Sequence, residues 1–309
     1  MSALPGYLDY PKRKPGLDHD RFAYRNLLRT DLPRAWPQGA GVALSISVYL
    51  EYFPMDMPRT PILPPGGMQR PGTSFWDYTL RDYGNRVAVY RLLKEFDKAG
   101  VKATFAVNSE VAERYPGLIA EITGQGHEIA ACGVDMGQLH YGAMDEDRER
   151  ALIAQSRDTL ARVSGQTVAG WYSPGNTQSL NTQRLVAEAG FAYLSDWAND
   201  DLAYPLAGGA GQLLSMPLNL ELSDRRFLFE QNQPLAEWEL RCITGLHYLG
   251  REARARGIRQ ASLNLTPWII GQPYRVASLR RVLAAAASDR NLWIAPAAEV
   301  ARAWTEVMA

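Results

Sequence analysis

Residues that could carry out catalysis follow three apolar segments of the chain. Glu51 ends one of these segments, Cys132 ends a second, and Thr266 lies near the end of a third. A carboxylate such as Glu51 could act as the general base that activates water, and it does so best when its surroundings raise its pKa. A thiol such as Cys132 could be a nucleophile or a soft metal ligand if a nearby cation or base lowers its pKa, or it could be a small buried apolar residue.

His140 is the histidine whose position best suits the same site. It lies in residues 133–144, directly beyond Cys132, and this segment could fold back over the thiol. Loops at such positions frequently carry function. We therefore predict that Glu51, Cys132 and His140 are catalytic. The alternative role for Glu51 is a structural ion pair with Arg86 or another basic group.

A second group of residues at or just beyond strand ends is expected to contact the substrate. Tryptophan and tyrosine side chains there could wall a pocket for a planar or ring-shaped ligand, or they could belong to the core. Asp200 and Asp201 could anchor substrate N–H groups or cap a turn, and Arg275 could clamp an anionic substrate or bridge loops. The predicted substrate-binding residues are Arg86, Trp171, Tyr172, Trp197, Asp200, Asp201, Thr266, Trp268 and Arg275.

The elements that must position these residues alternate between strand and helix patterns. Strands are expected at residues 41–51, 102–108, 127–132, 168–173, 191–197, 212–220, 261–268 and 292–296. Helices are expected at residues 86–99, 109–124, 146–164, 181–189, 235–256 and 276–287. This alternation predicts an α/β fold with a parallel sheet. We favour a distorted (β/α) barrel of TIM type with seven or eight strands over an open doubly wound sheet. In such a barrel the chemistry lies at the carboxyl ends of the strands.

The chain is expected to form a single domain. Residues 1–40 contain scattered prolines and aromatic residues and are interpreted as an N-terminal arm on the surface, while residues 41–309 form the barrel. Residues 52–75 are rich in proline and glycine and form a long loop, which inside a compact domain is usually a lid or a binding loop.

Composition excludes several classes of partner. The formal net charge is +0, which gives no electrostatic attraction for nucleic acid or an anionic membrane. No apolar run approaches the roughly 20 residues of a membrane-spanning helix, and the N-terminal residues do not resemble a secretory signal. The 2 cysteines cannot build a disulfide framework. We therefore expect a cytoplasmic protein that acts on a small molecule.

Several segments, taken in order, are similar to a known family. They are RDYGNRV (81–87), ATFAVN (103–108), GHEIAACG (126–133), GWYSPG (170–175), AEAGFAYLSDWANDD (187–201) and LTPWIIGQPYR (265–275). The chain resembles the polysaccharide deacetylases, and most closely their cytoplasmic branch of PuuE-type allantoinases and cyclic imide hydrolases. The resemblance covers about residues 40 to 305. It implies a distorted (β/α) barrel that hydrolyses amide bonds, and it also suggests a homo-oligomer.

The metal site that the resemblance implies is altered in this chain. Metal-dependent members use an aspartate and two histidines, whereas the matching positions here hold Glu51, Cys132 and Thr266. Zinc prefers three or four nitrogen, sulfur or oxygen ligands in a tetrahedral array, and this set is a poor substitute. We therefore expect no metal and no other cofactor.

Three functional hypotheses follow. The first is a hydrolase of non-peptide carbon–nitrogen bonds (amide, imide or ureide) in a small cyclic or aromatic molecule, with no metal. The second is a non-catalytic descendant that keeps the pocket to bind a ligand. The third is a deacetylase whose metal site is rebuilt from Glu51, Cys132 and His140.

Overall fold

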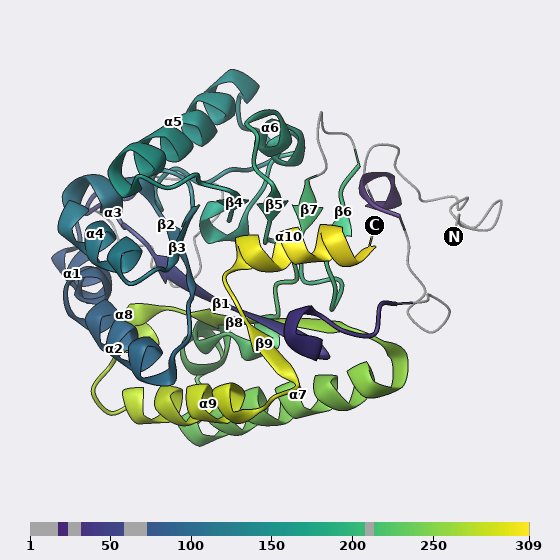
Figure 1. The fold of residues 1–309 in the computed structure, drawn as a ribbon. Helices are drawn as coiled ribbons and strands as arrows, with labels where there is room; N and C mark the ends of the chain where they lie inside the picture. The colour runs from purple at the N-terminus through teal and green to yellow at the C-terminus, as the bar shows by residue number, and fades with distance from the viewer. Residues whose placement is uncertain (1–17, 24–31, 59–72, 208–212, 309) are drawn as a thin grey trace.

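The computed structural model of the protein describes residues 18–23, 32–58, 73–207 and 213–308. Within these residues, nine strands form one sheet that curls into an incomplete barrel, with helices around it (Figure 1). Eight of the strands lie in the order β6-β7-β5-β4-β3-β2-β1-β8, and β9 pairs with β1 beside this path. All strand pairs are parallel except β6 with β7. The predicted distorted (β/α) barrel is confirmed.

The strands are short except for β1 and β8. They are β1 (Val42–Leu50), β2 (Thr104–Val107), β3 (Glu128–Ala131), β4 (Gly170–Trp171), β5 (Tyr193–Leu194), β6 (Tyr204–Pro205), β7 (Leu214–Ser215), β8 (Arg259–Leu265) and β9 (Leu292–Ile294). The α-helices are α1 (Phe75–Tyr83), α2 (Val89–Ala99), α3 (Ser109–Arg114), α4 (Pro116–Gly124), α5 (Glu146–Ser164), α6 (Thr182–Glu188), α7 (Leu235–Arg256), α8 (Pro267–Ile270), α9 (Val276–Ser288) and α10 (Ala297–Met308). No helix in the described part of the chain is both long and apolar enough to cross a membrane.

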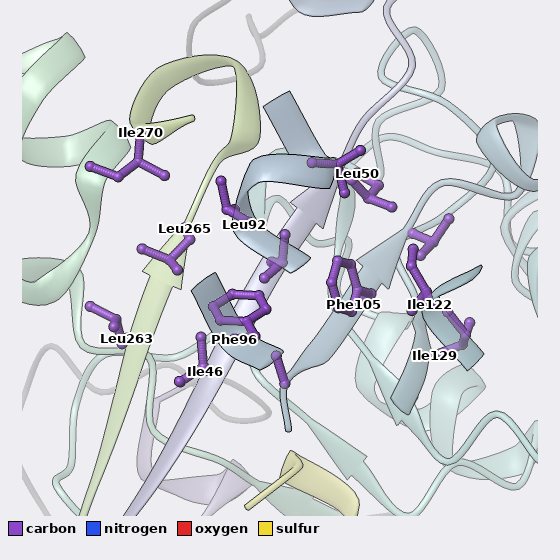
Figure 2. Packing of buried hydrophobic residues seen from close by; sticks show 14 of the residues in the cluster. Ile46, Leu50, Leu92, Phe96, Phe105, Ile122, Ile129, Leu263, Leu265 and Ile270 are labelled. Carbon is purple, nitrogen blue, oxygen red and sulfur yellow. The ribbon is translucent and has the colours of Figure 1, made fainter. Parts of the chain in front are cut away.

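The outer face of the sheet packs against the helices. Alternate residues of β1, such as Ile46 and Leu50, belong to the main apolar cluster, because successive side chains of a strand point to opposite faces. Figure 2 shows them beside Phe105 of β2 and Phe96 of α2. Phe96 and Phe105 meet edge to face with ring centroids 6.4 Å apart. This outer layer supplies most of the buried apolar surface that stabilises the fold.

The inner face of the sheet is more polar. Ser47 of β1 and Tyr172, which follows β4, are hydrogen-bonded through their hydroxyl groups at 3.0 Å. Because β1 and β4 are separated by two strands in the sheet, this contact crosses the barrel interior. Tyr193 of β5 likewise donates to the Glu128 carboxylate of β3 at 2.8 Å. The barrel centre is therefore filled by hydroxyl and carboxyl groups as well as by apolar atoms.

The gap between β7 and β8 is closed by side chains. Asn219 follows β7, and its backbone N–H donates to Ser262 Oγ of β8 at 2.9 Å. The backbone N–H of Ser262 returns a bond to Asn219 Oδ1 at 2.7 Å. A single parallel bridge joins Ser223 to Asn264 further along. These contacts replace a regular ladder, and they explain why the barrel is distorted.

The described part of the N-terminal segment is tied into the core. Trp36 is 2% exposed, packs near Trp293 and Trp304 with centroids 6.0 and 6.1 Å away, and donates to the Arg259 carbonyl at 2.7 Å. This anchoring differs from the predicted surface arm. Helix α10 lies across the end of the barrel at which the strands begin (Figure 1), where Ala298 N–H donates to the Glu128 carboxylate.

Several elements differ from the sequence prediction. The helix expected from residue 86 instead begins with α1 and reaches α2 through a π-helical turn, η3 (Gly84–Ala88). A second π-helical turn, η6 (Arg225–Glu230), and the helix α10 were not predicted. Strands β4, β5 and β7 are much shorter than their apolar runs. The neighbouring residues still form backbone hydrogen bonds, but these do not extend the regular ladder. Of the expected loop 52–75, residues 59–72 lie outside the described residues.

Candidate functional site

A cavity opens where β1 and β8 end. Its enclosed part measures about 30 Å³, and the empty space is about 370 Å³ when the open mouth is counted. The residues that line it are Tyr49, Glu51, Gly175, Asn176, Leu218, Leu220, Ser223, Arg225, Asn264 and Thr266. The cavity thus includes two of the three residues that the sequence singled out first, and it lies at the strand ends where a barrel carries its chemistry.

Glu51 is the acidic centre of this cavity. Its residue is 4% exposed, and one carboxylate oxygen accepts a hydrogen bond from Arg225 Nη2 in a buried ion pair. The backbone carbonyl of Glu51 accepts from Asn85 Nδ2 at 2.9 Å, which fixes the end of β1. Arg225 therefore occupies the role that the sequence gave to Arg86 as the ion-pair partner of Glu51.

Two π-helical turns position the groups around Glu51. Asn85 belongs to η3, and Arg225 is the first residue of η6. The π-helix is rare and occurs frequently at functional sites, because its wider turn changes the direction of side chains. Both turns direct a polar side chain toward the end of β1. Two distant and unusual backbone turns therefore converge on one carboxylate.

Charges around the cavity are unevenly compensated. Burial alone would lower the pKa of Arg225, but the charge of Glu51 and the hydrogen bond to it outweigh burial and raise that pKa. Asp224 is fully buried, and burial raises its pKa to about 7. Its Oδ2 accepts the backbone N–H of Thr266 at 2.8 Å. Asp224 is therefore partly protonated near neutral pH, next to a permanently charged guanidinium.

Cys132 lies in the barrel interior but is poorly suited to be a nucleophile. It is 1% exposed, and burial, followed by the negative charges of Glu51 and Asp196, raises the pKa of its thiol well above the ordinary value. The opposing effect of Arg225 is smaller. A thiolate is the reactive form of cysteine. The structure places Cys132 among buried residues and outside the lining of the cavity, and a catalytic role for it stays a prediction.

His140 pairs with a different residue from the one expected. Its Nδ1 lies 2.9 Å from Glu149 Oε1, and its ring packs on Trp171 with centroids 5.5 Å apart. Glu149 also accepts from Ser179 and Thr182, and these bonds outweigh burial and lower its pKa. His140 thus belongs to a buried network behind the β4 strand, and the predicted pairing with Cys132 is wrong.

Asp196 links this network to the barrel interior. It accepts from the Ser173 backbone N–H at 2.7 Å and from Gln178 Nε2 at 2.6 Å. Burial raises its pKa to about 6. Asp196 also lines a second, open hollow together with Arg21, Phe22, Trp197, Ala198 and Asn199.

Of the predicted aromatic contacts, two belong to the core. Trp171 is fully buried and donates to Ser173 Oγ at 2.9 Å, and Tyr172 is bonded to Ser47 inside the barrel. Trp197 is partly exposed in the second hollow and donates to Gln178. Trp268 is 5% exposed and meets Phe229 edge to face at 4.9 Å. None of these four side chains is among the residues that line the cavity of Glu51.

The predicted polar contacts divide in the same way. Thr266 lines the cavity. Asp200 caps a turn by accepting Leu202 N–H at 3.0 Å, and Asp201 accepts Gln260 N–H through its backbone carbonyl. Arg275 donates to the Ile269 carbonyl at 3.0 Å and so bridges a loop.

Arg86 lies away from the site. Its side chain is 68% exposed, and its nearest described acidic partner is Asp82 at 3.9 Å. The predicted substrate-binding role of Arg86 is therefore corrected to that of a solvent-facing residue on η3.

The sequence reasoning missed eight of the ten residues that line the cavity. Tyr49 and Asn264 stand two residues before Glu51 and Thr266 on the same faces of their strands, and the period of two along a strand could have indicated them. Arg225 lies in a π-helical turn far along the chain, and no pattern in the sequence points to it. Of these missed residues, Arg225 is the one bonded to Glu51.

Comparison with known proteins finds a family similarity. The model of the polysaccharide deacetylase family matches residues 78–194. The matched region includes Asn85, Cys132 and His140, whereas Glu51, Arg225 and Thr266 lie outside it.

Individual proteins show the same similarity. A protein from Pseudomonas aeruginosa PAO1 described as a probable polysaccharide deacetylase is 28% identical, with a TM-score of 0.81 over 91% of this chain and 98% of that one. The PuuE allantoinase is 26% identical, with a TM-score of 0.80 over 96% of this chain and 98% of that one. A Schizosaccharomyces pombe protein assigned to the polysaccharide deacetylases is 24% identical over 72% of this chain and 74% of its own length.

The predicted donor groups are not gathered into a metal site. Within the described residues, no three histidine, cysteine, aspartate or glutamate side chains are grouped so that they could hold a metal ion. Glu51 is engaged by Arg225, and His140 is turned toward Glu149. The independence of the reaction from a metal stays a prediction.

Several polar atoms of the cavity lack a protein partner. Tyr49 Oη, Arg225 Nε and Asn264 Oδ1 are buried, and each is without a hydrogen-bond partner among the described residues. Buried polar groups in proteins are nearly always bonded, to protein, water or ligand. Three such atoms around one cavity mark it as a site for a polar molecule.

Proposed function

We propose that the protein hydrolyses a carbon–nitrogen bond of the amide, imide or ureide type in a small molecule, with Glu51 as the general base. The observation that carries this proposal is the buried Glu51–Arg225 pair in a cavity whose remaining polar atoms are unsatisfied. The polysaccharide deacetylase family and the likeness to the PuuE allantoinase support hydrolysis as the reaction class.

The proposed reaction divides the work between the two members of the pair. Glu51 takes a proton from a water molecule while the water oxygen forms a bond to the substrate carbonyl carbon. The Arg225 guanidinium compensates the negative charge that develops on the carbonyl oxygen, as preorganised donors do in acyl transfer. The carbon–nitrogen bond then breaks, and Glu51 returns the proton to the leaving nitrogen. The products are a carboxylic acid and an amine or amide.

The cavity also limits the size of the substrate. Its enclosed part measures only about 30 Å³, and the empty space is about 370 Å³ with the open mouth, which favours a small molecule over a polymer segment. Leu218 and Leu220 form its apolar wall, and Tyr49 presents an aromatic ring beside Arg225, whose guanidinium lies 5.9 Å from the ring centroid. A small cyclic imide or ureide matches this combination of one apolar wall and several polar atoms. The cytoplasmic location and the homo-oligomer remain predictions.

The test is turnover in a variant that keeps the shape of the site. Purified protein is assayed by acid release on succinimide, hydantoin, allantoin and N-acetylglucosamine. Glu51→Gln is expected to lower kcat/KM by about 10²- to 10⁴-fold on the substrate that turns over. Glu128→Gln is the matched control, because Glu128 is a half-buried carboxylate at the start of β3, at the other end of the barrel. Full turnover by a folded Glu51→Gln variant would refute this role.

A ligand-binding protein without catalysis is the second candidate. It is favoured by the protonated Cys132 thiol and by Thr266, since neither side chain is a base at neutral pH. This alternative predicts that one of the four compounds raises the melting temperature while none of them is hydrolysed. Hydrolysis of any of them that depends on Glu51 would exclude it.

A further inference from the structure

We propose that Asn264 recognises a substrate N–H group through its Oδ1 atom. The site would then accept amides, imides and ureides that carry a hydrogen on the nitrogen next to the reacting carbonyl. It would disfavour their N-alkylated counterparts and the corresponding esters. This inference rests on the proposed hydrolase function and extends it from a reaction class to a substrate class.

The orientation of the Asn264 amide is decided by its neighbours. Its Nδ2 donates to the Asn219 carbonyl at 3.1 Å and to the Ser262 carbonyl at 3.3 Å, and it lies 3.2 Å from Ser262 Oγ. Two of these partners are carbonyl oxygens, which can only accept. A flipped amide would place Oδ1 against them. The nitrogen must therefore face Asn219 and Ser262, and the oxygen must be the remaining atom.

Asn264 Oδ1 is a hydrogen-bond acceptor without a donor among the described residues. Asn264 is 2% exposed and lines the cavity, and its Oδ1 is buried without a hydrogen-bond partner in the described ranges. On β8, Asn264 shares the inner face with Ser262, while Leu263 and Leu265 belong to the outer cluster. An unpaired buried acceptor weakens binding of any ligand that offers it no hydrogen.

The acceptor is held rigidly. Asn219 donates its backbone N–H to Ser262 Oγ and accepts the Ser262 N–H on Oδ1, at 2.9 and 2.7 Å. These are the bonds that close the barrel between β7 and β8, so the clamp that fixes Asn264 is part of the fold. A side chain fixed in this way loses little conformational entropy when a ligand binds.

Other residues that line the cavity offer donors. Arg225 Nε is an unpaired N–H donor, and the Tyr49 hydroxyl is also unpaired among the described residues. A carbonyl group next to an N–H presents an acceptor and a donor side by side, and it can satisfy Arg225 and Asn264 together. An ester or lactone satisfies only Arg225 and places a second acceptor against Asn264 Oδ1.

The test measures binding separately from turnover. Calorimetric titrations of the whole protein compare succinimide with N-methylsuccinimide, and 2-pyrrolidinone with γ-butyrolactone, which replaces the N–H by oxygen without adding a methyl group. We expect each N–H compound to bind about 10- to 100-fold more tightly than its counterpart. Asn264→Leu is expected to abolish the preference in the lactone pair, and Arg86→Gln, on the solvent-facing helix, is expected to preserve it.

The outcomes separate this inference from the proposed function. Equal affinity within both pairs for the unmodified protein overturns the role of Asn264, even if Asn264→Leu does not fold. A preference that survives in a folded Asn264→Leu variant also overturns it, as does a failure of all four compounds to bind. Tight, selective binding without hydrolysis would leave the Asn264 inference standing and refute the hydrolase instead.

Discussion

The two faces of the sheet follow different chemistry along the same strands. On the outer face of β1, Ile46 and Leu50 are fully buried among apolar side chains of the helices (Figure 2). On the inner face of the same strand, Ser47 and Tyr49 lead to Glu51, and their neighbours are hydroxyl, amide and guanidinium groups. The comparison indicates that the outer face stabilises the barrel and that the inner face can therefore hold polar groups that cost stability.

The outer face should give the largest loss of stability. Phe105→Ala removes a fully buried ring that packs on Phe96 and on His127, with centroids 6.4 and 5.3 Å away. We expect the free energy of unfolding to fall by about 3–5 kcal/mol, measured by urea denaturation. Val87→Ala, at a 41% exposed position, is the control and should change it by less than about 0.5 kcal/mol. A small effect of Phe105→Ala would break the comparison.

The polar groups near the cavity should reduce stability at neutral pH. The pKa of Asp224 is raised by burial to about 7, above its ordinary value of 3.8. The folded state thus binds a proton more tightly than the unfolded chain does, and the free energy of unfolding falls as pH rises from about 4 through 7. Each unit of pKa difference corresponds to about 1.4 kcal/mol.

The isosteric variant Asp224→Asn removes this titration. Its unfolding free energy should depend less on pH between 4 and 7 than that of the unmodified protein, and the difference should be greatest above pH 7. Urea denaturation at a series of pH values provides the measurement. Identical pH profiles for the two proteins would show that burial does not raise the pKa of Asp224.

A substitution on the solvent-facing side of the helices should give the smallest change in the free energy of unfolding. Arg86 and Asp82 approach to only 3.9 Å, and the arginine is largely exposed. Exposed ion pairs contribute little, because water and salt screen them. Arg86→Gln should change the unfolding free energy by less than about 1 kcal/mol and leave turnover unchanged. A large loss of turnover would show that Arg86 takes part in substrate binding.

The sequence predicted the barrel well because the outer face has a strong pattern. The apolar runs that became β1, β2, β3 and β8, and the long helices α5 and α7, were located to within about three residues. Glu51 and Thr266 were found for the same reason, since each follows one of these runs. The family resemblance indicated which residues at the strand ends correspond to the family's metal ligands.

The remaining parts of the site depend on contacts that leave no local pattern. Arg225 reaches Glu51 from a π-helical turn 174 positions away, and the pairing of His140 with Glu149 required the packing of α5 behind β4. Trp171 and Tyr172 were expected at the rim, but the short β4 strand places both in the interior. Burial, rather than residue type, decided which of these side chains can meet a ligand.

The central claim is that Glu51, on the inner face, performs the chemistry while its neighbour Leu50 supports the fold. The decisive measurement is kcat/KM per folded molecule for Glu51→Gln and Leu50→Ala, together with the unfolding free energy of each. Both variants should be less stable, because one loses a buried ion pair and the other leaves a cavity. Only Glu51→Gln should lose turnover, by about 10²-fold or more. Normal turnover by Glu51→Gln, or an equal loss in folded Leu50→Ala, would contradict this account.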